Sequence, residues 1–165
     1  MSARSGIGYD SHRFEEGRPL VLAGVEIPDA ERGLTGHSDA DVLAHAAIDA
    51  LLGAAGLGDI GQHYPDTDER WKDADSIGLM GEVCRFLCDH GWTILHLDAT
   101  VICEAPKLGP HRDEMRARLA DAVSLAPLEV NVKFSTNEGM GFVGRGEGIA
   151  ALAVATVERA DQPDG

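Results

Sequence analysis

The sequence has few of the features that mark membrane, secreted or nucleic-acid-binding proteins. No apolar run approaches the roughly 18 residues that a membrane-spanning helix needs. The opening residues, MSARSGIGYD, do not have the basic and then apolar order of a signal peptide. These absences predict a cytoplasmic protein.

Cysteine and basic residues are also scarce. Three cysteines, an odd number, do not form a disulfide framework and fit a reducing compartment. The chain has 14 Lys and Arg residues against 28 Asp and Glu, and its net charge of −14 repels nucleic acids and anionic lipids. We therefore expect no nucleic-acid or membrane partner, and a small anion only where a metal or local cations overcome this field.

The residues that are present suit one globular domain. A chain of 165 residues with 44% hydrophobic content can bury one core but is short for two domains. We expect a single catalytic domain over 1–158 and a flexible polar tail over 159–165.

Hydrophobic periodicity predicts a mixture of strands and helices. The expected elements are strands over 4–9, 20–27, 92–104 and 129–136, helices over 38–55, 76–90 and 111–125, and a long loop over 57–75. The first two strands are close enough in sequence to pair as a hairpin, and 149–157 fits either helix or strand. This order predicts an α/β (α+β, two-layer) fold, in which helices cover one face of a mixed β-sheet.

Three residues from two segments form a candidate metal site. Asp10 and His12 lie two apart in GYDSHRF, so in an extended strand both side chains project to the same side. His45 lies on the helix predicted over 38–55. Taken singly, the first two also suit a turn and His45 also suits a core position. Together, one carboxylate and two imidazoles suit zinc, and three protein ligands leave one coordination position open for a substrate oxygen.

The same helix carries Asp41 and Asp49, each four residues from His45. We expect these side chains to form one stripe with His45, and Asp49 to orient the imidazole as a second-layer acceptor. Ser38 is the expected N-cap, and with His37 before it the helix N-terminus is a candidate phosphate site.

Two further segments offer polar side chains where predicted strands end. Lys107 is one of few cations in this acidic chain, and it either contacts a phosphate or is a solvated surface residue. Ser135, Thr136 and Glu138 either bind a phosphate and a magnesium ion or form an ordinary polar turn.

The glycine-rich segment EGMGFVGRGEG matches neither the Walker nor the dinucleotide-binding pattern. Within it, Arg145 and Glu147 have the spacing to pair across a tight turn or across a subunit boundary.

Several segments, in order along the chain, share one resemblance: RSGIGYDSHRF, GLTGHSDADVLAHAAIDALLGAAGLGDIGQHYPDTD, DADS, APKLGPH and GFVGRGEG. With them the chain resembles the 2-C-methyl-D-erythritol 2,4-cyclodiphosphate synthase family over nearly its whole length. The resemblance implies a homotrimer with active sites between adjacent subunits. It also implies conversion of 4-diphosphocytidyl-2-C-methyl-D-erythritol 2-phosphate to the cyclic diphosphate and CMP, in non-mevalonate isoprenoid biosynthesis.

The resemblance also assigns roles to residues. The implied ligands of zinc, or of another divalent cation, are Asp10, His12 and His45. The implied ligand of magnesium or manganese at the diphosphate is Glu138. Catalytic roles fall on His37, Lys107 and Thr136. The implied substrate contacts are Asp10, His12, His37, Ser38, Asp59, Gly61, Tyr64, Pro65, Asp66, Asp68, Cys103, Lys107, Leu108, Ser135, Thr136, Glu138, Phe142 and Arg145. Phe142, Arg145 and Glu147 also match residues that line a central trimer cavity for isoprenoid diphosphates.

Two other functions remain open at this point. One is a zinc-dependent phosphohydrolase, in which the open metal position carries water and Asp41 acts as the general base. The other is a trimeric module that binds an isoprenoid diphosphate through Phe142, Arg145 and Glu147, with zinc in a structural role.

Overall fold

The structure is a computed structural model that describes residues 2–159. Most of the predicted tail, residues 160–165, lies outside the described residues. Arg159, where the tail was expected to begin, is the last residue of a long strand.

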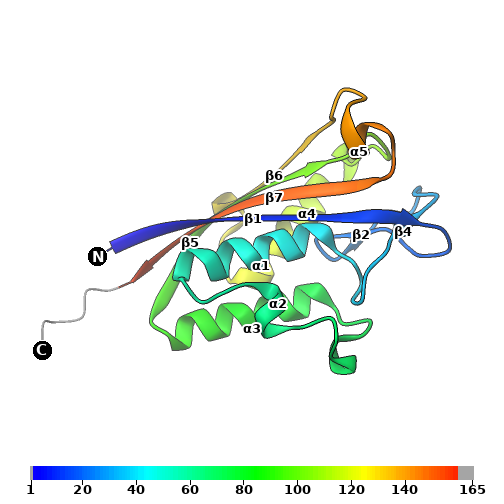
Figure 1. Cartoon of the computed structure of the whole chain (residues 1–165). Helices are drawn as coiled ribbons and strands as arrows, with labels where there is room; N and C mark the ends of the chain where they lie inside the picture. The colour runs from blue at the N-terminus through cyan, green and yellow to red at the C-terminus, as the bar shows by residue number, and fades with distance from the viewer. Residues whose placement is uncertain (1, 160–165) are drawn as a thin grey trace, which may run out of the picture.

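A five-stranded sheet forms one layer of the fold (Figure 1). Its strands, in spatial order, are β4 (Gly33–Leu34), β1 (Ser2–Glu15), β7 (Gly148–Arg159), β5 (Trp92–Ile102) and β6 (Val130–Ser135). Only β5 and β6 run parallel, and the other neighbours are antiparallel. The sheet is therefore mixed, as predicted.

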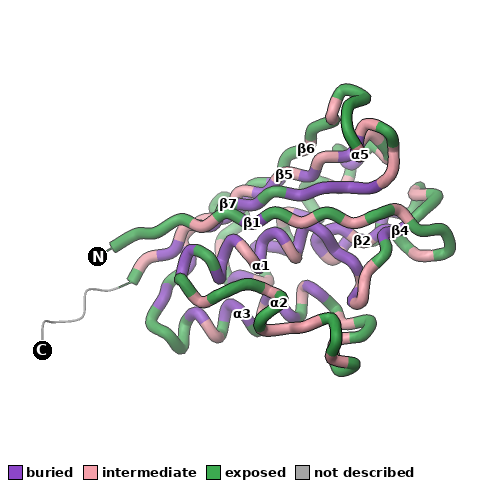
Figure 2. Tube along the Cα trace, viewed as in Figure 1, coloured by how far each residue is buried: buried purple, intermediate pink, exposed green. Residues whose placement is uncertain are grey.

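Three long helices cover one face of this sheet, and the core lies between the two layers (Figures 1 and 2). They are α1 (Val42–Ala55), α3 (Ser76–Asp89) and α4 (Arg112–Val123). Short helices complete the fold: α2 (Ile60–His63), α5 (Gly141–Gly144) and the 3₁₀ turns η1 (Glu69–Trp71), η2 (Gly109–His111) and η3 (Pro127–Glu129). The predicted two-layer α/β class is confirmed. Within residues 2–159, no helix is both long and apolar enough to cross a bilayer.

Glycines let α1 pack unusually close to β1. A Cβ on Gly8 would lie 1.8 Å from the carbonyl oxygen of Ala46, and a Cβ on Gly6 would lie 2.3 Å from that of Ala50. Only a residue without a side chain permits this approach. It brings the first turns of α1 against the β1 residues that follow Gly8.

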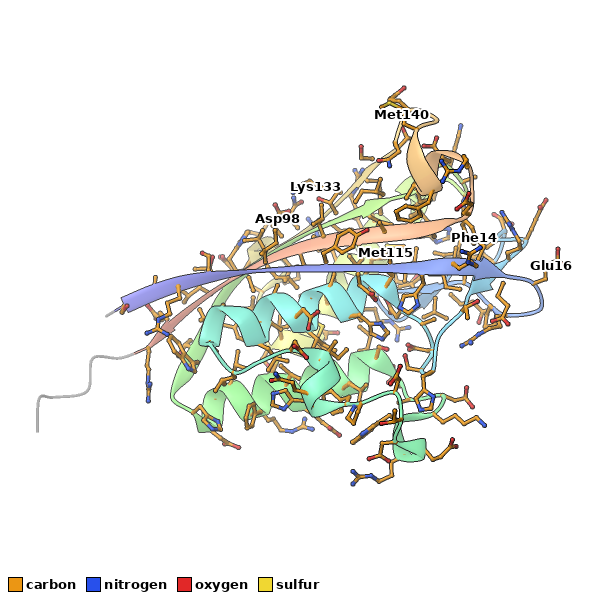
Figure 3. All side chains as sticks on the ribbon, viewed as in Figure 1. Phe14, Glu16, Asp98, Met115, Lys133 and Met140 are labelled. Carbon is orange, nitrogen blue, oxygen red and sulfur yellow. The ribbon has the colours of Figure 1, made fainter. Side chains whose placement is uncertain are left out.

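The opposite face of the sheet differs along its width. On β1 and β7 it presents exposed apolar side chains, namely Ile7, Tyr9, Leu152 and Val154. Toward β6 it turns polar, where the Lys133 ammonium contacts the Asp98 carboxylate (Figure 3).

The predicted hairpin between 4–9 and 20–27 is wrong. β1 pairs instead with β7, from Ser2 opposite Arg159 to Arg13 opposite Gly148. The segment 20–27 folds back on itself as strands β2 (Val21–Leu22) and β3 (Val25–Glu26). Ala23 and Gly24 between them have φ of 51° and 70°, the geometry of a tight two-residue hairpin turn.

Smaller differences concern boundaries and one undecided segment. The segment 149–157 is part of strand β7. The loop over 57–75 contains α2 and η1. The first helix begins at Val42 rather than near Ser38, because Asp41 provides its N-cap.

Candidate metal centre and substrate cavities

Asp10, His12 and His45 meet where β1 passes the start of α1. The Asp10 Oδ2 atom lies 2.8 Å from His12 Nε2 and 3.0 Å from His45 Nδ1, and the two nitrogens are 3.2 Å apart. Alternation along β1 turns both of its ligands toward α1, as predicted. A metal-binding group of one carboxylate and two imidazoles is therefore present.

The outward-facing ring nitrogens fix the tautomer of each histidine. His12 Nδ1 lies 2.6 Å from the carbonyl oxygen of Thr35, so it carries a hydrogen and donates. His45 Nε2 lies 2.8 Å from the Ser76 hydroxyl oxygen. That hydroxyl donates its only hydrogen to Asp39 Oδ1 at 2.5 Å, so it accepts the hydrogen of His45 Nε2.

In the neutral imidazoles, both inward-facing nitrogens therefore carry lone pairs, and they face a carboxylate oxygen. Three acceptors this close repel one another unless a cation lies between them. A divalent ion matches this donor set, since zinc takes neutral imidazole nitrogens and carboxylate oxygens. The residues present thus fit a metal ion.

The same electrostatics governs the proton affinity of the site. Burial opposes ionisation of Asp10, but when the imidazoles are protonated, their hydrogen bonds and positive charge lower the Asp10 pKa to about 2. Burial also opposes charging of His12, but the Asp10 carboxylate raises the His12 pKa. The site favours positive charge.

Asp49 does not orient His45, so that prediction is wrong. The Asp49 Oδ1 atom accepts from the backbone N–H of Ile60 at 2.8 Å and ties α1 to the start of α2. The second nitrogen of His45 faces Ser76 and, at 3.1 Å, the hydroxyl of Ser38.

The predicted N-cap at Ser38 is also wrong. Asp41 caps α1 by accepting from Ala44 N–H at 3.0 Å, and it accepts from Ala23 and Gly24 N–H groups at 2.9 and 2.7 Å. Its carboxylate is completely buried. The helix N-terminus therefore already holds an anion of its own, which removes the basis for the predicted phosphate site there.

A cavity of about 440 Å³ opens in front of the metal centre. The metal ligand His45 lines it, and so do most of the predicted residues of the first substrate region: Asp10, His12, His37, Ser38, Gly61, Tyr64, Pro65 and Asp66. Two others support its wall instead. Asp59 caps α2, and Asp68 caps η1 while its carbonyl oxygen lies 3.1 Å from His37 Nε2.

A second cavity of about 420 Å³ lies at the carboxyl ends of the parallel strands β5 and β6. It is lined by the predicted residues of the other substrate region: Cys103, Lys107, Leu108, Ser135 and Thr136. Glu138 lies just beyond, where its Oε1 atom accepts from the Thr136 hydroxyl at 3.3 Å. The two cavities share no lining residue.

Comparison with known proteins identifies the family. The YgbB family model matches residues 3–158. The chain belongs to the YgbB family. It is 57% identical over 157 residues to the 2-C-methyl-D-erythritol 2,4-cyclodiphosphate synthase of Salinibacter ruber, covering 95% of this chain and 99% of that protein.

Longer relatives of this family also match. The bifunctional enzyme IspD/IspF of Anaeromyxobacter dehalogenans is 55% identical over 94% of this chain, which spans only 40% of that protein. Among solved structures, a 2C-methyl-D-erythritol-2,4-cyclodiphosphate synthase in a CDP-bound form superposes with a TM-score of 0.85 at 40% identity. That match covers 94% of this chain and all of the other.

The glycine-rich segment of this family member lies beside β1. Phe142 and Glu147 line a third, smaller cavity of about 190 Å³ together with His12. The Arg145 Nε donates to Glu147 Oε1 at 2.7 Å. Within the chain, the two residues therefore pair across the turn, one of the two predicted arrangements.

Several residues at the first cavity were missed by sequence reasoning. Ile60, Trp71 and Leu79 supply apolar walls, and the rings of Trp71 and Tyr64 meet edge to face at 4.9 Å. Arg18 donates to the carbonyl oxygens of Gly36 and Ser38 at 2.9 and 2.8 Å and so clamps the backbone around His37. The loop residues had no periodicity, and no local pattern distinguished Arg18 from the other arginines of the chain.

Proposed function

We propose that this chain is a metal-dependent enzyme that converts 4-diphosphocytidyl-2-C-methyl-D-erythritol 2-phosphate into 2-C-methyl-D-erythritol 2,4-cyclodiphosphate and CMP. The reaction serves non-mevalonate isoprenoid biosynthesis in the cytoplasm, and residues 1–158 form its catalytic domain. The observation that carries this proposal is the convergence of three acceptors from Asp10, His12 and His45 on the floor of a cavity. Full-length relatives with this activity in their names support the same conclusion.

Zinc at the triad and magnesium or manganese at Glu138 are the metals that we propose. A divalent ion at the triad supplies positive charge that polarises phosphate oxygens, which a chain of net charge −14 otherwise lacks. Glu138 offers the hard carboxylate oxygen that magnesium prefers.

The chain's own residues align the reacting groups. The apolar walls formed by Ile60, Trp71 and Leu79 suit the carbon skeleton of the methylerythritol, while His37 lies at the same cavity for its polar groups. In the second cavity, Leu108 and Cys103 suit the cytosine, and Lys107, Ser135 and Thr136 suit its phosphates.

The chemistry needs alignment more than a protein nucleophile. An oxygen of the 2-phosphate attacks the β-phosphorus, the bond from that phosphorus to the bridging oxygen breaks, and CMP leaves with that oxygen. Burial raises the pKa of the Cys103 thiol to about 11, so this group stays protonated and is not a nucleophile. His37, Lys107 and Thr136 then act by orienting phosphates and neutralising their charge.

We also propose that the enzyme is a homotrimer with active sites between adjacent subunits. Within one chain the two cavities share no residue, so a second copy is needed to bring a cytidine pocket to a metal centre. The exposed apolar face of β1 and β7 suits such contacts. A central cavity closed by Phe142, Arg145 and Glu147 would then suit an isoprenoid diphosphate.

The test is product analysis in ¹⁸O-labelled water. Cyclisation releases CMP with no solvent oxygen in either product. A phosphohydrolase would instead incorporate labelled oxygen, and that result would overturn the proposal. The structure already disfavours Asp41 as the hydrolytic base, because both of its oxygens accept backbone N–H groups and it is fully buried.

The alternative of a binding module with structural zinc makes a different prediction. Such a site would have four protein ligands, whereas the group found among residues 2–159 has three. Zinc-dependent folding without any turnover would favour this alternative.

A further inference from the structure

Ser76 occupies a position that the metal triad and the substrate residues do not explain. It is the first residue of α3, and it is completely buried. Its hydroxyl oxygen lies between two side chains from other parts of the chain, 2.8 Å from His45 Nε2 and 2.5 Å from Asp39 Oδ1. A buried hydroxyl between an imidazole and a carboxylate needs a reason.

Helix α3 does not need this hydroxyl. Its N-cap is Asp75, whose carboxylate accepts from Ile77 N–H at 3.2 Å. The backbone N–H of Ser76 already holds Asp39 by donating to Oδ2 at 3.0 Å. The hydroxyl therefore adds nothing to the capping of the helix, and its contacts serve His45.

We propose that Ser76 is a positioning residue for the metal centre, acting through His45 with Asp39 behind it. The hydrogen bonds run in one direction, from His45 Nε2–H to the Ser76 oxygen and from the Ser76 hydroxyl to Asp39. This order keeps the hydrogen on Nε2, so that the Nδ1 lone pair points at Asp10 and His12. The charge of Asp39 polarises the chain and makes Nδ1 a stronger donor to a cation.

Ser38 cannot replace Ser76 in this role. Its hydroxyl lies farther from His45 Nε2, at 3.1 Å, and accepts from Ala40 N–H at 3.3 Å. It lies 3.5 Å from the Ser76 hydroxyl, at the limit of a hydrogen bond. Of these two hydroxyls, that of Ser76 is the one that joins the His45 Nε2 atom to a carboxylate.

The arrangement also couples the metal to the substrate segment. Asp39 follows His37 and Ser38, both of which line the first cavity. The hydrogen bonds from His45 through Ser76 to Asp39 therefore end beside these residues, and His45 would hold the ion at their other end. The inference rests on the metal site of the proposed function, but not on the cyclisation.

The test is zinc affinity, measured by competition between the metal-free full chain and a chromophoric chelator. Ser76→Ala removes only the hydroxyl, and we expect zinc affinity to fall by about 10- to 100-fold, the usual effect of losing such a supporting partner. Ser76→Thr retains a hydroxyl and is expected to stay within a few-fold of the parent chain. Cobalt-loaded Ser76→Ala should also show altered visible absorption bands, which a purely structural loss would not produce.

Cys84→Ala is the matched control. It deletes one buried heavy atom from the same helix without touching the site, so a general loosening of α3 would appear here too. We expect this variant to bind zinc as the parent does.

The outcomes separate the two proposals. If the parent chain binds no zinc, the metal site of the proposed function fails. If the parent binds zinc and Ser76→Ala binds it equally well, the role of Ser76 is overturned. Should Ser76→Ala not fold, Asp39→Asn decides, because it keeps the shape and removes the charge. Unchanged zinc affinity in that variant would equally contradict the inference.

Discussion

Each histidine of the metal centre uses its two ring nitrogens for opposite tasks. The outward nitrogens of His12 and His45 donate to Thr35 and Ser76, and the inward nitrogens are left with lone pairs beside Asp10. Neither imidazole can then satisfy the other, so the site is prepared for a cation before one binds. This preparation lowers the cost of ordering the ligands when the ion arrives.

Removal of one ligand should therefore affect activity much more than stability. We expect His45→Ala to lower the rate of CMP release on the order of 10²- to 10³-fold, which is comparable to the loss of a main electrostatic contact in an active site. Zinc binding should be lost, while the urea midpoint of unfolding of the metal-free chain changes little. His90→Ala, at the exposed C-cap of α3, is the control and should keep full activity. An active, zinc-loaded His45→Ala would show that the ligand assignment is wrong.

At the scale of elements, the contact between β1 and α1 sets the distance between the ligands. Asp10 and His12 belong to the strand, and His45 belongs to the helix. The glycines of β1 fix how near these elements come. The metal centre therefore depends on the glycines of β1 as well as on the three residues that would bind the ion.

A methyl group at this contact should damage both the fold and the site. We expect Gly8→Ala to lower the free energy of unfolding by about 3 kcal/mol or more, because its Cβ would lie 1.8 Å from a backbone oxygen. Zinc affinity should fall with it, as α1 is pushed away from β1. Gly53→Ala, an exposed position on α1 with its nearest contact at 3.9 Å, should instead stabilise the chain by about 0.5–1 kcal/mol. Chemical unfolding with urea measures both, and equal effects of the two would contradict the argument.

The buried cap of α1 provides a second prediction at this scale. Asp41 accepts three backbone N–H groups from α1 and from the turn between β2 and β3. In Asp41→Asn an amide NH₂ would face one of these donors, leaving it unpaired at a cost of about 1–3 kcal/mol. Urea unfolding tests this, with the exposed Asp121→Asn as a control expected to be nearly neutral. A loss in Asp41→Asn no larger than in the control would exclude the capping network as a source of stability.

At the scale of the whole molecule, two features motivate the proposed trimer. The metal centre and the second cavity are separate, and the open face of the sheet exposes Ile7 at 70% and Tyr9 at 52%. Exposed apolar side chains grouped on two neighbouring strands are typical of a contact surface.

A charge on this surface should disrupt assembly without removing the metal. We expect Ile7→Lys to shift the particle from trimer to monomer in light scattering and to abolish turnover, while zinc binding remains. Leu128→Lys, at an exposed residue of η3 outside this face, is the control and should leave both assembly and turnover intact. A fully active monomer would show that one chain contains the complete site.

Sequence reasoning succeeded where a local pattern carries the information. The spacing of Asp10 and His12 needs only the alternation of a strand, and the apolar periodicity of α3 and α4 gives their existence and type. It failed where distant segments meet. The partner of β1 is β7, over 130 residues away along the chain, and hairpin reasoning favours the nearest strand.

The same limit applies to the site. Ser76 reaches His45 and Asp39 only because α3 packs beside α1, and no spacing within either helix predicts that contact. Asp49 had the better sequence position for this role, but its carboxylate instead accepts from the backbone N–H of Ile60, in a segment that was expected to be a loop. Residues whose roles depend on packing between segments were therefore beyond prediction from periodicity.

Strand β1 serves two surfaces through its alternation. Its even-numbered residues supply Asp10 and His12 to the helix side, while its odd-numbered residues supply Ile7 and Tyr9 to the open face. One residue added to or deleted from β1 would turn each of the following side chains to the opposite face of the sheet. A change of length in β1 would therefore disturb the metal centre and the open face together, whereas a substitution affects only the face on which that side chain lies.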